Sequence, residues 1–101
     1  MVILEPYQER LARLCAAHHV LRLELFGSAV KGDFDSSTSD LDFLVEFENL
    51  KTGEYAEAYF GLLEDLEALF HRPIDLVMVT AIKNRYFLEN IQNSRKLLYA
   101  A

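Results

Sequence analysis

Residues 40–47 alternate between two kinds of side chain, and this pattern constrains the fold more than any other feature of the sequence. Every second residue from Leu41 to Phe47 is apolar, whereas Asp40 and Asp42 occupy positions of the opposite parity. Successive side chains of a β-strand point to opposite faces of a sheet. The pattern therefore predicts a strand that buries one face in a core and carries two carboxylates together on the other face.

The remaining periodicities predict helices and further strands around this one. Leu21, Leu23 and Leu25 alternate with polar residues, which predicts a half-buried strand. Residues 74–79 are nearly all apolar, which predicts a strand in the centre of the sheet. In chain order the predicted elements are helix 5–18, strand 21–26, a short turn of helix 28–32, loop 33–39, strand 40–47, helix 54–71, strand 74–79 and helix 84–99. The predicted fold class is α/β (α+β), with a single small mixed sheet and helices packed on it.

Length and composition limit what such a fold can carry. With 101 residues, of which 51% are hydrophobic, the chain has room for one domain, so residues 1–101 are expected to form a single domain. One cysteine, Cys15, is typical of a protein from a reducing compartment. No stretch has the pattern of a signal peptide or of a membrane span. We therefore expect a cytoplasmic protein that does not act at a membrane.

The balance of charges indicates the kind of partner. Ten Lys and Arg residues against sixteen Asp and Glu residues give a formal net charge of −6. Proteins bind nucleic-acid backbones mainly by neutralising phosphates with cations, so direct binding of nucleic acid is not expected here. The same charge favours a basic protein partner or a site that holds divalent cations. The large apolar fraction also favours association, as a homo-oligomer or a hetero-oligomer.

The residues that suit chemistry stand where two of the predicted strands meet their loops. Asp40 and Asp42 direct their carboxylates to the same face, about 7 Å apart at their bases. Such a pair can hold Mg²⁺, which completes its shell with water and substrate phosphates. Gly27 and Ser28 stand where a strand turns into a short helix, whose free N–H groups attract an anion, and glycine lets a phosphate approach the backbone closely.

Asp75 interrupts the apolar strand 74–79, where burying a carboxylate without a partner is costly. If it reaches the metal pair, Asp75 is either a third ligand or the group that takes a proton from an attacking hydroxyl. Three carboxylates and an anion site suit phosphoryl or nucleotidyl transfer, in which catalysis consists mostly of positioning and charge neutralisation.

These motifs resemble the signature of the nucleotidyltransferase (DNA polymerase beta-like) superfamily: Gly27-Ser28, then Asp40-x-Asp42, then an aspartate in a later strand. The small size is similar to that of the minimal nucleotidyltransferase (MNT) family, the antitoxin half of HEPN/MNT toxin–antitoxin pairs. The resemblance extends over nearly the whole chain and includes strand 21–26, residues 73–77 and the ending 94–101.

The resemblance implies a Mg²⁺-dependent enzyme that uses ATP. Such an enzyme transfers AMP to a tyrosine hydroxyl of a partner HEPN ribonuclease toxin, releases pyrophosphate and thereby neutralises the toxin. Carried over by position, the family pattern makes Gly27 and Ser28 the residues that hold the triphosphate of ATP, with Lys31 in place of a family arginine. The implied metal ligands and catalytic residues are Asp40, Asp42 and Asp75.

Other functions share parts of this pattern. Family members often carry arginines after the Gly-Ser pair, whereas Lys31 is the one basic residue among residues 29–35. This leaves open a catalytically silent antitoxin that neutralises its toxin by binding alone. Antibiotic nucleotidyltransferases share the signature but need an additional domain to hold the drug, and transfer onto RNA ends is disfavoured by the charge of −6.

Two further groups of residues have simpler interpretations. Tyr55, Tyr59 and Phe60 are predicted to pack helix 54–71 against the sheet, although an exposed tyrosine there would also suit a partner. The remaining group has the spacing of a metal site but lacks a second cysteine, so we interpret its members as core and surface residues. These are Cys15, His18 and His19.

Overall fold

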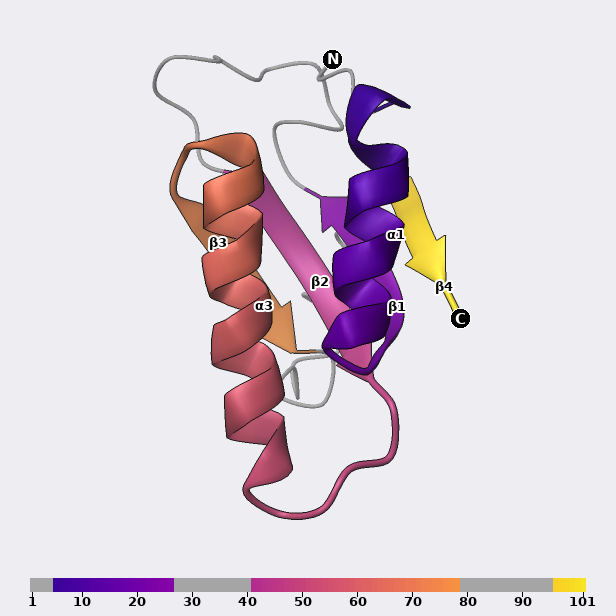
Figure 1. Ribbon diagram of the computed structural model, residues 1–101, viewed down its shortest axis with the longest axis vertical. Coiled ribbons are helices and arrows are strands. Elements are labelled where there is room, and N and C mark those ends of the chain that lie inside the picture. The colour runs from indigo at the N-terminus through magenta and orange to yellow at the C-terminus, as the bar shows by residue number, and fades with distance from the viewer. Residues whose placement is uncertain (1–4, 27–40, 79–95) are drawn as a thin grey trace.

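The computed structural model describes residues 5–26, 41–78 and 96–101 of the chain. In this part, two helices cover one face of a four-stranded mixed sheet (Figure 1), which confirms the predicted fold class. In chain order the elements are η1 (Glu5–Tyr7), α1 (Gln8–Ala17), β1 (Val20–Phe26), β2 (Leu41–Phe47), α3 (Glu54–Phe70), β3 (Ile74–Met78) and β4 (Lys96–Ala100). No helix in these three ranges is long and apolar enough to cross a membrane.

The strands lie in the order β3-β2-β1-β4. Strand β1 pairs antiparallel with both β2 and β4, and β2 pairs parallel with β3 after the chain has passed through α3. The prediction that residues 74–79 form a central strand was wrong, because β3 lies at the edge of the sheet formed by the described strands. Its apolar residues are partly buried at this edge because α3 packs along it.

The C-terminal residues also differ from the prediction of a helix over 84–99. Lys96–Ala100 form β4, which pairs antiparallel with β1 from Leu25↔Lys96 to Arg22↔Ala100. This pairing satisfies the backbone groups of β1 on the side away from β2, which a terminal helix would not do. Residues 84–95 of the predicted helix, like the predicted turn 28–32 and loop 33–39, lie outside the described residues.

The core lies between the two helices and the sheet. Leu11 and Cys15 of α1 are buried, four residues apart, and α3 buries Ala58, Leu62 and Leu66 at the same spacing. They pack on the sheet face whose buried residues are Val20, Leu23, Leu25, Leu41, Phe43, Val45, Phe47 and Leu76. The predicted apolar face of strand 40–47 is therefore the core face of β2.

A β-bulge changes the burial predicted for the first strand. The register between β1 and β2 shifts between Val20 and Arg22, so Val20 rather than Leu21 faces the core. Val20 is fully buried, whereas Leu21 is 41% exposed. An extra residue in one strand of an antiparallel pair reverses the parity of the residues beyond it, which explains the error at Leu21.

Helices α1 and α3 approach each other closely at Gly61. A Cβ atom at this position would lie 2.8 Å from Cε1 of His18, which is closer than real Cβ contacts. The half-buried His18 ring is held there by Asp65, whose Oδ2 lies 2.5 Å from the ring Nε2. Glycine at this position therefore lets the end of α1 pack against α3.

We expect the Gly61→Val variant to lose about 1–3 kcal/mol of unfolding free energy, because the branched side chain must displace the His18 ring or separate the helices. The matched control is Ala68→Val on the same helix, where the side chain is exposed and the change should stay within about 0.7 kcal/mol. Urea unfolding followed by circular dichroism measures both. A Gly61→Val variant as stable as the control would contradict the close approach.

The buried thiol of Cys15 makes the stability of the fold depend on pH. Burial raises the pKa of this thiol from 9.0 to about 12. The folded state thus keeps a proton that the unfolded state releases, so this group's contribution to stability is complete below pH 9.0 and declines towards pH about 12. In urea titrations above pH 9.0, the Cys15→Ala variant should lose stability with pH less steeply than the unmodified protein. Equal slopes would contradict the buried, neutral thiol.

Candidate active site

Asp42 and Asp75 lie side by side on the face of the sheet that α1 and α3 leave uncovered. They are register partners in the parallel pair of β2 and β3, whose strands run about 4.8 Å apart. Phe43 and Leu76, the next residue on each strand, belong to the core on the helix face. Because side chains alternate along a strand, both carboxylates belong to the opposite face.

The end of β1 meets the same row. Phe26, the last residue of β1, is the register partner of Asp42, so Phe26, Asp42 and Asp75 follow one another across three strands. Gly27 and Ser28 come directly after Phe26 in the sequence. The predicted site residues Gly27, Ser28, Lys31 and Asp40 lie outside the described residues. Of the predicted set, the structure therefore brings together Asp42 and Asp75.

The two carboxylates differ in their exposure to solvent. Asp42 is half-buried and Asp75 is exposed. A third acidic residue on this face, Glu24, is only 6% exposed, and its Oε1 lies 3.3 Å from Nε of Arg22. The alternation in strand 21–26 predicted that Glu24 faces solvent. Alternation alone does not show which polar residues of a strand are buried. Glu24 thus has a cationic partner of its own two residues away on β1.

The donor set fits a hard divalent cation. Two carboxylates in adjacent strands, one of them exposed, supply protein oxygens and leave room for water and phosphate oxygens, as Mg²⁺ requires. Among residues 5–26, 41–78 and 96–101, no group of three or more His, Cys, Asp or Glu residues is placed to hold a metal ion. Of the three predicted ligands, Asp42 and Asp75 lie side by side in the structure, and Asp40 lies outside the described residues.

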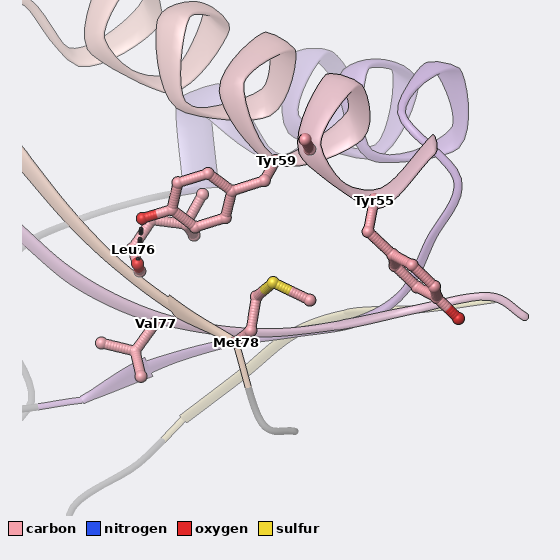
Figure 2. A pocket seen from close by; sticks show the side chains of 6 residues that line it. Tyr55, Tyr59, Leu76, Val77 and Met78 are labelled. Carbon is pink, nitrogen blue, oxygen red and sulfur yellow. Dashed lines mark hydrogen bonds between the residues drawn. The ribbon is translucent and has the colours of Figure 1, made fainter. Parts of the chain in front are cut away.

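An apolar pocket lies between α3 and β3, the strand that carries Asp75 (Figure 2). Its volume is about 420 Å³, and its lining residues are Tyr55, Ala56, Tyr59, Leu76, Val77 and Met78. Figure 2 shows the Tyr59 ring lying over β3, where its hydroxyl donates a hydrogen bond of 2.6 Å to the carbonyl oxygen of Leu76. Both tyrosines are half-buried, but Phe60 is 62% exposed, so the prediction that it packs on the sheet was wrong.

Several solved structures share this fold. The chain is 29% identical to a candidate minimal nucleotidyltransferase, with a TM-score of 0.75 over 92% of this chain and 90% of that one. It is 18% identical to a chain of a toxin–antitoxin crystallised with AMP-PNP, with a TM-score of 0.69 over 94% of this chain and 74% of that one. The third is a Shewanella oneidensis complex of a tri-AMPylated HEPN toxin with an MNT antitoxin (16% identity, TM-score 0.66, 98% and 74% coverage). The last two similarities, at low identity, show the fold alone.

Sequence comparison supplies the family. No curated protein matches the chain closely in sequence. A sequence model of the nucleotidyltransferase domain, however, matches residues 8–98 and so covers both helices and the row from Phe26 to Asp75. This agrees with the resemblance carried by Gly27-Ser28 and Asp40-x-Asp42. The chain belongs to the nucleotidyltransferase domain family.

Proposed function

We propose that this protein is an MNT-type antitoxin that transfers AMP from ATP to a tyrosine hydroxyl of a cognate HEPN ribonuclease toxin, releases pyrophosphate and thereby neutralises the toxin. The observation that carries the proposal is the pairing of Asp42 with Asp75 beside the end of β1. Two proteins of the same fold support it, one crystallised with AMP-PNP and one bound to an AMPylated HEPN toxin.

In the proposed reaction Asp40, Asp42 and Asp75 would hold Mg²⁺, which would neutralise charge on the triphosphate. Asp75, exposed beside Asp42, also accepts the proton of the tyrosine hydroxyl as its oxygen forms a bond to the α-phosphorus. The bond between the α-phosphorus and the bridging oxygen to the β-phosphate breaks, and pyrophosphate leaves with that oxygen.

The residues after β1 complete the proposed site. Gly27 and Ser28 bind the triphosphate through backbone N–H groups, and the ammonium group of Lys31 adds a positive charge. This arrangement positions the nucleotide at the end of the two central strands, where Phe26 and Asp42 lie in register. Positioning of this kind supplies a large part of the rate in phosphoryl and nucleotidyl transfer.

The type of transfer is tested with two labelled forms of ATP. The product of the neighbouring gene, which the proposal takes to be the HEPN protein, is incubated with the chain, Mg²⁺ and ATP labelled at either the α- or the γ-phosphate. We expect covalent label on the HEPN protein from the α-labelled form only, together with loss of its ribonuclease activity. Label from the γ-labelled form instead would indicate phosphoryl transfer and contradict the proposal.

A second candidate is an antitoxin that acts by binding alone. The observation that favours it is the single basic residue, Lys31, among residues 29–35, since binding of a triphosphate usually uses several cations. In that case the same incubation gives a stable complex and an inhibited ribonuclease but no label from either form of ATP.

A further inference from the structure

The pocket between α3 and β3 shares strand β3 with the proposed site of transfer but has a different character. Its lining is aromatic and aliphatic, and the exposed Phe60 adjoins it on α3. We call this surface, made of the pocket and Phe60, the aromatic surface. Aromatic residues grouped around an open pocket are typical of the centre of a protein–protein interface.

The aromatic surface is held in place by contacts within the chain. The Tyr59 hydroxyl donates a hydrogen bond to the Leu76 carbonyl oxygen, and the Tyr55 hydroxyl accepts a hydrogen bond of 3.0 Å from the backbone N–H of Leu50. The Phe60 ring meets that of Tyr59 edge to face, with centroids 5.2 Å apart and planes at 90°. A surface whose side chains are already fixed loses little conformational entropy when a partner binds.

The aromatic surface and the proposed site of transfer share strand β3. Leu76 and Val77 line the pocket and directly follow Asp75 on β3. At about 3.3 Å per residue, the pocket begins within about 7 Å of Asp75 along the strand. Leu76 faces the helices and Asp75 lies on the opposite face, but β3 is the edge strand of the described sheet, so a partner seated in the pocket reaches the Asp75 face around this edge.

The charged residues of α3, the helix that carries Tyr55, Tyr59 and Phe60, are all acidic. Helix α3 carries Glu54, Glu57, Glu64, Asp65 and Glu67 and has neither lysine nor arginine. Glu57 and Glu64 are three residues before and four residues after Phe60, so they are its neighbours on the helix surface. Both are exposed. Charge complementarity to α3 therefore favours an occupant with basic groups around an apolar anchor.

We propose that the aromatic surface is the docking site for the protein that accepts AMP, which inserts an apolar side chain into the pocket and places lysine or arginine residues against the glutamates of α3. This inference rests on the proposed function and adds to it the place and the chemistry of acceptor recognition. Docking there holds the acceptor chain at the edge strand that carries Asp75, which raises the effective concentration of its hydroxyl at the site of transfer.

Two pairs of variants test the docking site. Ala56 is exposed and lines the pocket, so Ala56→Arg obstructs the pocket and adds a repelling charge. Its control is Ala68→Arg, exposed on the same helix but turned by about 120°. Phe60→Ser removes the exposed ring, and its control is Leu97→Ser, which removes a 49% exposed leucine of β4.

We expect Ala56→Arg and Phe60→Ser to weaken binding of the HEPN protein about tenfold or more and to raise the KM for the HEPN protein to a similar extent. The controls should match the unmodified protein. Binding of Mg²⁺-ATP, measured by calorimetry on each variant alone, should not change. Circular dichroism and urea unfolding show that the variants remain folded.

Four results would overturn the docking site. The first is unchanged binding and KM in both pocket variants while the unmodified chain transfers AMP, which leaves the proposed function intact. The second is weaker ATP binding in these variants, which would make the pocket part of the nucleotide site. The third is a change in self-association alone, seen in sedimentation, which would make the occupant a second copy. The fourth is an unmodified chain that neither binds nor modifies the HEPN protein, which would overturn the proposed function as well.

Discussion

The Asp42→Asn variant is expected to lose AMP transfer by a factor of about 10² or more while keeping its fold. The substitution leaves the shape of the side chain nearly unchanged but removes the negative charge that the proposed Mg²⁺ ligand supplies. Loss of one preorganised electrostatic contact to a developing charge typically costs a factor of about 10²–10³ in rate. Initial rates of label transfer from α-labelled ATP measure the effect.

The control for this variant is Glu46→Gln. Glu46 lies on β2 four residues beyond Asp42, on the same face of the sheet, about 13 Å further along the strand. Both substitutions neutralise one half-buried acidic side chain of the same strand, but only one of them touches the proposed site. Equal transfer rates in the two variants would contradict the role of Asp42.

The second large effect is on stability. Phe43 is completely buried in the centre of the core, and its ring stacks on that of Phe70 with centroids 5.8 Å apart. We expect Phe43→Ala to lower the unfolding free energy by about 3–5 kcal/mol, because it removes the transfer free energy of the ring and leaves a cavity. For a domain with a total of about 5–15 kcal/mol, this is a large fraction.

Equilibrium unfolding in urea measures this loss, and Leu21→Ala provides the comparison. Leu21 is an apolar residue of the same sheet, but it is 41% exposed, so its truncation should cost about 0.5–1 kcal/mol at most. A loss below about 1 kcal/mol for Phe43→Ala would show that burial of this ring contributes little to the stability of the fold.

Helices and strands in which the spacing of apolar residues repeats several times were predictable from the sequence. The helical spacing over residues 54–71 appears as α3, and the alternation over residues 40–47 appears as β2 with its predicted core face. In both, the buried set repeats often enough to define a helix or a strand without knowledge of the partner. The predicted helix 5–18 likewise corresponds to η1 and α1.

Features that depend on distant partners were not predictable. Five residues, Lys96–Ala100, are compatible with either a helix or a strand, and their pairing with β1 decides between them. The bulge beside Leu21 has no local signature, since it exists only in the register with β2. The edge position of β3 likewise follows from the pairing of the other strands.

The candidate site divides in the same way. The parity of Asp42 follows from the period of two in its strand, so the face that it occupies was predictable. That Asp75 stands directly beside it depends on the parallel register of β2 and β3, which the sequence does not encode locally. For Tyr55, Tyr59 and Phe60 the sequence predicted packing and left partner binding open, because their spacing is equally typical of a buried helix face.

The most direct test of AMP transfer is the intact mass of the HEPN protein after incubation with this chain, ATP and Mg²⁺. The proposal predicts a gain in whole AMP units with the unmodified chain and with Glu46→Gln, and a much slower gain with Asp42→Asn. An unchanged mass of the HEPN protein in a stable complex with the unmodified chain would contradict AMP transfer and would leave neutralisation by binding alone.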